Sequence, residues 1–437
     1  MTKILITDGT LVTNQGLQSG DVRIRDGVIT EVGTALTREG DELVVDASGQ
    51  WVGPGFVDLH THLREPGGEA AETIASGARA GIAGGYTALV AMPNTEPALD
   101  TVALVSFVLA EGGRSPITVA VAGAITQSRA GEQLAPMAEM AALGVRIFTD
   151  DGAGVQSAGV MRRALSYSKP LGVRLAQHCE DATLSGSGVM NEGPLAEKLG
   201  LAGRSELAEE IMVQRDIDLV RATGASVHFL HLSTKRAIDL VVAAKIEGLD
   251  VTCEVTPHHL TLDESFCSDY DPTFKVHPPL RSAHDVLALR EALRKGLIDA
   301  VATDHAPHTP ESKDRAFDEA PAGMLGLETA ASLTYEALGQ DKCDPELFYT
   351  VLSRGPARVA QLRHIDRPIG LSPQGGALSV GEAANITVFD PRVSWEANAN
   401  TLQSRASNTP YHGRAMFGRV SSVISKGILA LQEGKLQ

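Results

Sequence analysis

The sequence has few of the features that mark exported, membrane-bound or nucleic-acid-binding proteins. It holds four cysteines in 437 residues, and none lies in a CxxC pair or in the close spacing of a disulfide framework, which favours a reducing compartment. No stretch reaches the roughly 20 unbroken apolar residues that a bilayer span requires. The N-terminal residues also lack a sustained apolar run followed by a small-residue cleavage site. We therefore expect a cytoplasmic protein without a membrane partner.

Basic residues are also scarce relative to acidic ones. Lys and Arg number 38 against 54 Asp and Glu, for a net charge of -16, and no Lys/Arg cluster stands out. A nucleic-acid partner requires a basic surface to neutralise its phosphates, so none is expected. What the chain does have is apolar material. At 43% hydrophobic residues it can build one large domain and a smaller one.

The hydrophobic pattern changes along the chain. As far as Val52 it shows short alternating strands separated by turn residues. From Gly55 onward short apolar runs alternate with segments long enough for helices, which is typical of βα units. Eight such runs begin at Phe56, Thr87, Ile117, Val145, Val173, Ser226, Asp250 and Asp299. Eight parallel strands over about 250 residues match a TIM-type (β/α)8 barrel.

The β pattern returns after about Gly375. We therefore predict an α/β protein in which both chain ends build one small β-sandwich beside the barrel. The predicted boundaries are 1–54 and 376–437 for the two parts of the sandwich and 55–375 for the barrel.

Side chains that bind metals end several of the predicted barrel strands. His60 and His62 close the first strand, and because side chains alternate along a strand they point to the same side. A single histidine near a strand end is more often structural than a ligand. Here, however, further ligand types end the fourth, fifth, sixth and eighth strands, namely Asp151, His178, His231 and Asp304. The C-terminal face of a TIM barrel is where active sites lie, so we predict a metal site there.

Six nitrogen and oxygen ligands are more than one tetrahedral zinc ion uses, whereas two ions with a bridging carboxylate account for all of them. We assign His60, His62 and Asp304 to the first ion and His178 and His231 to the second, with Asp151 as the bridge. The absence of cysteine from the set is compatible with zinc, and manganese or cobalt are alternatives.

Asp304 has a second predicted role as the catalytic residue. A carboxylate beside a metal-activated water can accept its proton as the oxygen attacks a carbonyl, then pass that proton to the departing amide nitrogen. The reaction class indicated is amide hydrolysis or its reversal. The alternative is that Asp304 is only a ligand or a helix N-cap.

The motifs around these residues resemble a known family. HTHLREPG from His60, MPNT from Met92, FTDDG from Phe148, HCED from His178, HLST from His231, EVTPHHL from Glu254 and ATDHAPH from Ala302 are similar to those of the bacterial class I dihydroorotases. The resemblance covers nearly the whole chain. It implies the interconversion of N-carbamoyl-L-aspartate and L-dihydroorotate in pyrimidine biosynthesis, with two zinc ions per chain. It also implies a homodimer, with aspartate transcarbamoylase as a possible partner.

A substrate with a carboxylate fits the residues beside the predicted metal site. Arg64 shares the parity of His60 and His62, and its guanidinium can bind a carboxylate in bidentate fashion. Asn94, just past the second strand, can hydrogen-bond the same carboxylate or the ring amide. The alternatives are a surface ion pair for Arg64 and a turn role for Asn94. The resemblance adds His62, His277, His308, Ala322 and Gly323 as substrate contacts, with loop capping as an equal alternative for His308.

Two departures from the family pattern bear on this site. His277 stands where the family commonly has Asn, and an imidazole that titrates near neutrality would lower substrate affinity or make it pH-dependent. Ala322 stands where an aromatic residue is more common, and the expected contacts there come from the backbone. The charged segment 311–323 follows the last strand and suits a mobile lid, although an ordinary solvated loop is an equal alternative.

The nearest alternative functions are those of allantoinases, hydantoinases and dihydropyrimidinases. By resemblance, these enzymes bridge their metals with a carboxylated lysine on the fourth strand, where this chain has Arg146. Arginine stays protonated and does not take up carbon dioxide, so Asp151 is the expected bridge. A different class of alternative is a non-catalytic barrel that scaffolds aspartate transcarbamoylase. Retention of all six predicted ligands argues against it.

Overall fold

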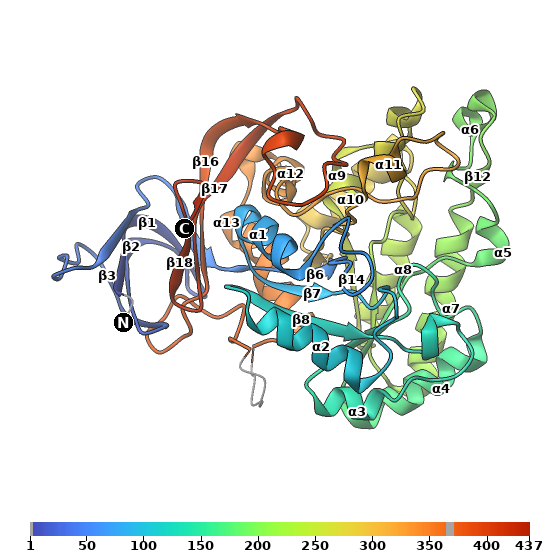
Figure 1. The fold of residues 1–437 in the computed structure, drawn as a ribbon, viewed down its shortest axis with the longest axis horizontal. Helices are drawn as coiled ribbons and strands as arrows, with labels where there is room; N and C mark the ends of the chain where they lie inside the picture. The colour runs from blue at the N-terminus through green and yellow to red at the C-terminus, as the bar shows by residue number, and fades with distance from the viewer. Residues whose placement is uncertain (1–2, 364–370) are drawn as a thin grey trace.

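The computed structural model describes residues 3–363 and 371–437 and contains the predicted parallel barrel (Figure 1). Its eight strands occur in the order β15-β14-β13-β10-β9-β8-β7-β6, and each printed pair is parallel. The strands are β6 (Phe56–Thr61), β7 (Tyr86–Ala91), β8 (Thr118–Gly123), β9 (Ile147–Thr149), β10 (Arg174–Gln177), β13 (Val227–Phe229), β14 (Val251–Val255) and β15 (Ala300–Val301). All eight predicted strand runs are confirmed.

The barrel closes between its first and last strands. Beyond the end of β15, His305 forms a parallel bridge with Thr61 of β6, and the His62 amide donates to the His305 carbonyl at 2.9 Å. Within the barrel, Val57, Leu59, Ala88 and Val90 belong to one buried cluster with residues of β8, β9, β10 and β15. Residues of the first, the last and the intervening strands meet in this cluster, as they do inside a closed barrel. The barrel is therefore a packed core, and space for chemistry lies at its mouth.

Helices cover the outside of the barrel, and several begin at a side-chain cap. Thr73, Ser157, Thr234 and Ser282 each accept an amide of the first turn of the helix that follows. The longer helices are α1 (Ile74–Gly84), α2 (Val102–Gly113), α4 (Ala158–Ser168), α7 (Leu207–Thr223), α8 (Lys235–Ile246), α10 (Ala283–Arg294) and α12 (Ala330–Ala337). Shorter ones are α3 (Met137–Ala142), α5 (Ala182–Ser185), α6 (Pro194–Leu199), α9 (Pro257–Thr261), α11 (Pro310–Lys313), α13 (Pro345–Tyr349) and α14 (Gly355–Val359).

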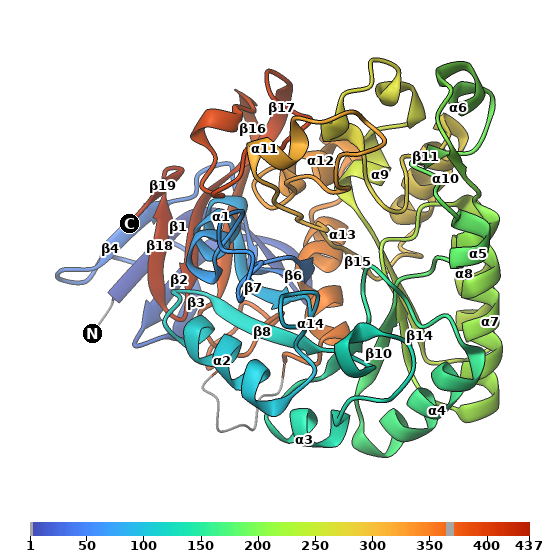
Figure 2. The ribbon, with the colours of Figure 1, turned by 45° about the vertical axis from the view of Figure 1, so that its right-hand side comes forward.

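A second, nine-stranded sheet joins the two ends of the chain, beside the barrel in Figure 2. From the N-terminal part come β1 (Lys3–Thr13), β2 (Gly16–Arg25), β3 (Val28–Gly33), β4 (Leu43–Asp46) and β5 (Trp51–Pro54). From the C-terminal part come β16 (Ile386–Glu396), β17 (Ala415–Ser425), β18 (Ile428–Gln432) and β19 (Lys435–Leu436). The two parts meet where β5 pairs antiparallel with β16. A separate two-stranded sheet pairs β11 (Met190–Asn191) with β12 (Gly203–Arg204).

One part of the C-terminal range lies outside the sheet. Residues 397–414, between β16 and β17, run beside the barrel loops that follow β15. The domain boundaries given above therefore remain a prediction. The four cysteines are buried and free. Among the residues described, no helix is long and apolar enough to cross a membrane.

Candidate metal centre at the barrel mouth

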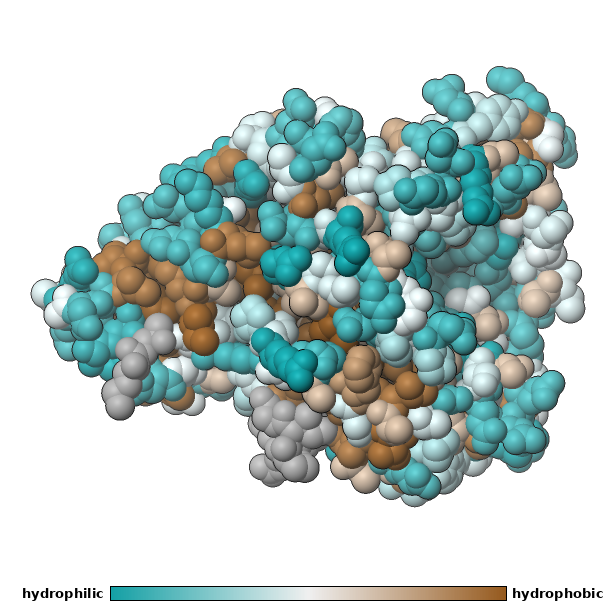
Figure 3. Space-filling view, viewed as in Figure 1, coloured by the Kyte–Doolittle hydropathy of each residue, from teal (hydrophilic) through white to brown (hydrophobic). Residues whose placement is uncertain are grey.

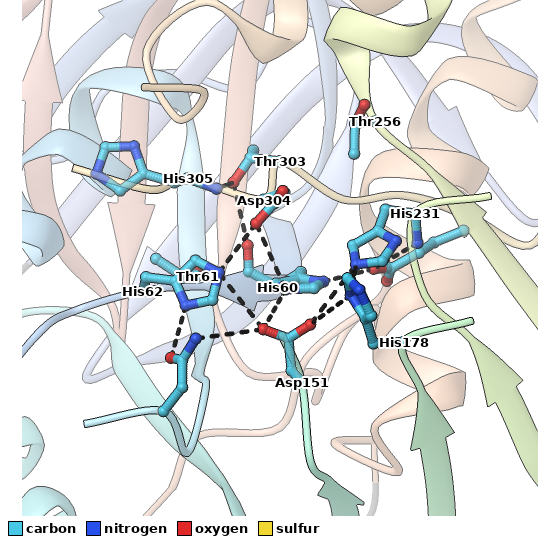
Figure 4. A network of polar contacts seen from close by, with 12 residues as sticks. His60, Thr61, His62, Asp151, His178, His231, Thr256, Thr303, Asp304 and His305 are labelled. Atoms are coloured by element: carbon cyan, nitrogen blue, oxygen red, sulfur yellow. Dashed lines mark hydrogen bonds and ion pairs between the residues drawn. The ribbon is translucent and has the colours of Figure 1, made fainter. Parts of the chain in front are cut away.

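The structure brings the six predicted ligand side chains together at the barrel mouth (Figure 4). All six are at most 7% exposed. We call them the metal cluster: His60, His62, Asp151, His178, His231 and Asp304. Two groups of potential ligand atoms, each within 4.8 Å of one another, share Asp151. One group adds His60 and His62, and the other adds His178 and His231.

Asp151 lies between two pairs of histidines and turns one oxygen to each pair. Its Oδ2 is 3.3 Å from His60 Nε2 and 3.6 Å from His62 Nε2. Its Oδ1 is 3.6 Å from both His178 Nδ1 and His231 Nε2. Ligands about 2.0–2.1 Å from a tetrahedral zinc ion lie about 3.3 Å from each other, so both sets of spacings suit a shared cation.

The histidine ring nitrogens that face the cluster are suited to metal binding. Glu254 Oε1 lies 3.0 Å from His60 Nδ1 and Asn94 Oδ1 lies 2.8 Å from His62 Nδ1, so both oxygens can accept the N–H of that ring. Glu180 Oε2 does the same for His178 Nε2 at 3.1 Å. In each ring the other nitrogen then keeps its lone pair toward the cluster. Among the residues that the structure describes, His60 Nε2 is buried without a hydrogen-bond partner, as expected of a ligand atom.

Asp304 completes the first half of the cluster. Its Oδ1 is 2.9 Å from His62 Nε2 and 3.5 Å from His60 Nε2. Burial alone would raise the pKa of this carboxyl, but when the two rings are protonated, the charge of His60 and the hydrogen bond from His62 outweigh burial and hold the pKa below its ordinary value. A cation held by the neutral rings would supply positive charge at the same place. Asp304 is therefore a carboxylate at neutral pH.

The sequence interpretation missed the carboxylates that hold the histidines. Glu254, at the end of β14, is fully buried and accepts from His60 through Oε1 and from His228 Nε2 through Oε2, at 3.0 Å each. Glu180 contacts His178 and pairs with Arg204. Both glutamates lie in motifs noted above, EVTPHHL and HCED, so their proximity to the ligands was the available signal. Carboxylates behind ligating histidines orient the rings and raise their basicity.

Three residues at the mouth have left-handed backbone conformations. Their φ angles are 60° for Arg64, 30° for His231 and 47° for Asp304. Such conformations cost side-chain-bearing residues on the order of 1–3 kcal/mol, and they concentrate at functional sites. At this mouth they coincide with two predicted ligands and the predicted carboxylate-binding residue.

Arg64 and Asn94 both lie beside the metal cluster. Asn94 contacts His62 through Oδ1 and donates from Nδ2 to Asp151 Oδ2 at 3.5 Å. Arg64 Nε donates to the Pro307 carbonyl at 3.1 Å. Within the described residues, neither terminal nitrogen of Arg64 has a hydrogen-bond or ion-pair partner. The surface ion pair considered above as the alternative for Arg64 is therefore absent from that part of the chain.

His308, Ala322 and Gly323 meet on one side of the mouth. His308 Nε2 lies 2.8 Å from the Ala322 carbonyl. Gly323 has a φ of 128°, and a Cβ there would lie 2.6 Å from Ala306 Cβ and 3.0 Å from His308 Nε2. Only glycine lets these two segments approach so closely. We call residues 305–309 and 321–326, together with Arg64, the rim loops.

The structure changes the expectation for His277. Burial, with a smaller effect of the Arg204 charge, lowers its pKa to about 3. The imidazole is therefore neutral at pH 7, and the expected titration near neutrality is wrong. Its Nε2 is buried without a hydrogen-bond partner in the described part of the chain.

Arg146 does not lie at the mouth. It precedes β9, and its guanidinium donates to the carbonyls of Ala141 and Val145 at 3.0 and 2.9 Å. These contacts lie at the end of β9 opposite to the mouth. The interpretation of Asp151 as the bridge therefore rests on the position of Asp151 itself rather than on Arg146.

The segment 311–323 is fastened to its surroundings in the structure. Phe317 is 2% exposed, and Lys313 is 6% exposed. Lys313 Nζ donates to the carbonyls of Pro272 and Pro321 at 2.8 Å each, and Lys275 Nζ donates to the Asp318 carbonyl at 2.9 Å. Its motion as a lid stays a prediction.

Comparison with known proteins identifies relatives over the whole length of the chain. A family model described as "Dihydro-orotase-like" matches residues 49–237. A dihydroorotase of Anaeromyxobacter dehalogenans is 44% identical over 100% of this chain and 99% of its own length. One of Mycobacterium tuberculosis is 42% identical over 95% of this chain and 96% of its own.

Similar solved structures include hydantoinases. The structure of a D-hydantoinase (dihydropyrimidinase) of a Thermus species matches with a TM-score of 0.83 and 27% sequence identity. The match covers 99% of this chain and 96% of the hydantoinase chain. An L-hydantoinase of Arthrobacter aurescens matches with a TM-score of 0.88 and 23% identity, over 100% of this chain and 98% of the hydantoinase chain. At 23% identity the second likeness concerns the fold alone, which supports the barrel and the sheet formed by both chain ends.

Proposed function

The chain belongs to the dihydroorotase family and is a cyclic amide hydrolase with dihydroorotase function, and we propose that it acts through two zinc ions bridged by Asp151. A metal site at the histidine and aspartate groups follows from the family and the geometry together. The number of ions, the roles of single residues and the absence of a carboxylated lysine are the proposed part. The substrate pair is N-carbamoyl-L-aspartate and L-dihydroorotate.

The position of Asp151 carries the two-ion proposal. Each of its oxygens lies 3.3–3.6 Å from a different pair of histidine nitrogens. A single tetrahedral ion cannot use four histidines and two carboxylates. With Asp151 shared, His60, His62 and Asp304 would hold one ion, and His178 and His231 would hold the other.

In the hydrolytic direction the reaction needs an activated water, a polarised amide carbonyl and a proton for the leaving nitrogen. Bound zinc ions would supply the first two by lowering the pKa of water and acting as Lewis acids. Asp304 would accept the proton of the attacking water and deliver it to the ring nitrogen as the amide bond breaks. Asp304 suits this role because it is ionised and lies 2.9 Å from His62 and 3.5 Å from His60, beside the position of the first ion.

Substrate recognition is assigned to residues around the metal cluster. The two terminal nitrogens of Arg64 would bind the substrate carboxylate in bidentate fashion. Asn94, His277, His308, His62 and the backbone of Ala322 and Gly323 would provide the remaining polar contacts. Burial, with a smaller effect of the Arg64 charge, lowers the pKa of His308 to about 3, so this ring binds as a neutral donor or acceptor.

The test is turnover of dihydroorotate by the purified protein, with metal content determined on the same sample. We expect about two zinc ions per chain and a loss of about 10²–10⁴ in kcat for Asp304→Ala. Hydantoin and allantoin serve as comparison substrates because they lack the ring carboxylate that Arg64 would bind.

The outcomes separate the alternatives. Faster turnover of a hydantoin than of dihydroorotate would overturn the substrate assignment and favour the hydantoinase alternative. Full activity at one ion per chain would overturn the two-ion proposal. Bound zinc without turnover of any of these substrates would favour the scaffold alternative, which adding aspartate transcarbamoylase would then test.

We also propose that the protein acts in the cytoplasm and that it forms a homodimer. The dimer is proposed because closed two-fold assemblies are the commonest among homo-oligomers. Light scattering on a size-exclusion column would measure the mass directly. A mass of one chain, 46.0 kDa, would contradict the dimer. Co-elution with aspartate transcarbamoylase would test whether the two proteins form a complex.

A further inference from the structure

A segment from the C-terminal part of the chain is fastened to the barrel mouth. It lies in the connection between β16 and β17, which Figure 1 shows in orange-red near α12. The amides of Gln403 and Ser404 donate to Glu328 Oε1 at 2.7 and 3.2 Å, and the Arg405 amide donates to Glu72 Oε1 at 3.2 Å. Two barrel carboxylates therefore hold the backbone just before Asn408.

The Asn408 side chain then contacts both rim segments at once. It is 6% exposed. Its Nδ2 donates to the carbonyls of Ala306 and Gly323 at 3.0 and 3.2 Å, and its Oδ1 accepts from the His308 amide at 3.0 Å. The backbone carbonyl of Asn408 accepts from the Leu325 amide at 3.1 Å. The side-chain amide thus uses two donors and an acceptor on three backbone groups.

The groups held by Asn408 surround the proposed carboxylate-binding side of the substrate site. Ala306 and His308 lie on either side of Pro307, whose carbonyl accepts Arg64 Nε at 3.1 Å. The His308 ring in turn contacts the Ala322 carbonyl at 2.8 Å, next to Gly323. Fixing residues 306, 308 and 323 therefore fixes the position of the Arg64 and His308 side chains as well.

We propose that Asn408 is a positioning residue for substrate binding, through which the C-terminal segment holds the rim loops in their substrate-binding arrangement. The inference rests on the proposed roles of Arg64, His308, Ala322 and Gly323. Asn408 is not part of the metal cluster. Its three side-chain hydrogen bonds go to backbone groups of the rim loops. Its loss affects the affinity for substrate more than the chemical step.

Asn408→Asp is the sharpest test, because it preserves the size and the acceptor for the His308 amide. The new carboxylate oxygen replaces Nδ2, which donates to the carbonyls of Ala306 and Gly323 at 3.0 and 3.2 Å. An anionic oxygen at that place repels both carbonyl oxygens. We expect KM for dihydroorotate to rise about tenfold to a hundredfold, while kcat stays within about threefold. Zinc content stays at the wild-type value.

Asn398→Asp is the matched control. Asn398 lies in the same connection, and its Oδ1 accepts the Asn400 amide at 3.0 Å, a bond that aspartate retains. Asn408→Ala is the second variant, since it removes the three side-chain bonds without adding a charge. It is expected to raise KM in the same direction by a smaller factor.

Three results would overturn the inference. One is an unchanged KM in both Asn408 variants. Another is an equal fall in kcat with loss of zinc, which would place the effect in the metal cluster. The third is unfolding of both variants at temperatures where Asn398→Asp is folded, because Asn408 would then support the whole fold. Failure of the proposed function is separate, since the wild-type protein would then not turn over dihydroorotate at all.

Discussion

The metal cluster and the rim loops lie next to each other at the barrel mouth, but they are held in place in different ways. In the metal cluster, side chains fix other side chains, as Glu254 fixes His60 and Glu180 fixes His178. In the rim loops, side chains fix backbone groups. Asn408 and Lys313 donate to three rim carbonyls between them, and Arg64 donates to a fourth.

This difference separates two functions of the same mouth. Side-chain pairs around the histidines control the charge and the ring orientation that a metal needs. Backbone contacts control where a loop lies, and hence the fit of the substrate. We therefore expect changes in the metal cluster to reduce metal content and kcat, and changes in the rim loops to alter KM.

The largest expected effect is that of Asp151→Asn. The amide cannot serve two cations with two anionic oxygens, so we expect loss of bound zinc and a fall in kcat of at least about 10³. Asp150→Asn is the matched control. Its carboxylate accepts the amides of Ile125 and Thr126 at 2.9 and 3.0 Å rather than facing the histidines, so this variant loses stability but keeps its zinc. Equal zinc loss in both variants would contradict the assignment.

The next largest effect is expected for Glu254→Gln, because Glu254 hydrogen-bonds the predicted ligand His60 and is not itself a predicted ligand. Its two oxygens accept from two histidine rings at 3.0 Å, and an amide can accept from only one of them. We expect zinc affinity to fall about 10–100-fold, measured by competition with a chelator. Glu264→Gln is the control, since Glu264 accepts from Asn191 at 2.7 Å, a bond that an amide oxygen retains. Unchanged zinc affinity in Glu254→Gln would show that the histidines need no such support.

Arg64→Lys tests the rim loops. Lysine keeps the charge but loses the bidentate geometry and the bond to the Pro307 carbonyl. We expect KM for dihydroorotate to rise about tenfold with zinc content unchanged, and the preference over a neutral hydantoin to shrink. A lower kcat at constant KM would instead place Arg64 in the chemical step.

The smallest expected effect concerns stability and pH. Burial and the nearby Lys275 lower the pKa of Lys313 to about 7, from an ordinary value near 10.5. Between these values the unfolded chain binds a proton that the folded chain does not, so the wild type gains stability as pH rises from 7 toward 10. Lys313→Met lacks this gain.

The stability of Lys313→Met relative to the wild type should therefore fall by about 1 kcal/mol per pH unit between pH 7.5 and 9. Thermal unfolding of both proteins across this range measures the difference. The exposed Lys342→Met serves as control and should follow the wild type at every pH. A constant difference for Lys313→Met would mean that Lys313 stays charged in the folded protein.

Much of the fold was predictable from local patterns. The eight barrel strands are short apolar runs at regular intervals, and all of them were located from sequence. The six ligand candidates were found because each lies at the end of such a run, and parallel strands bring their carboxyl ends to one face. Their functional roles rest on the family resemblance and on the tests above.

Other features depended on contacts between distant parts of the chain. His277 was expected to titrate near neutrality, but burial lowers its pKa to about 3, and burial is a property of the folded environment. Glu254 reaches His60 across 194 residues, and Asn408 reaches Ala306 across 102. No local pattern signals such pairs.

The sequence by itself determined the barrel, the sheet made from both ends and the places where ligand residues end strands, because these follow from the periodicity of apolar residues. Only the tertiary structure decided which carboxylate supports which histidine, and which distant asparagine holds the rim loops. The physical reason is that a hydrogen bond depends on positions within a few tenths of an ångström. Those positions are set by the packing of the whole chain rather than by its neighbouring residues.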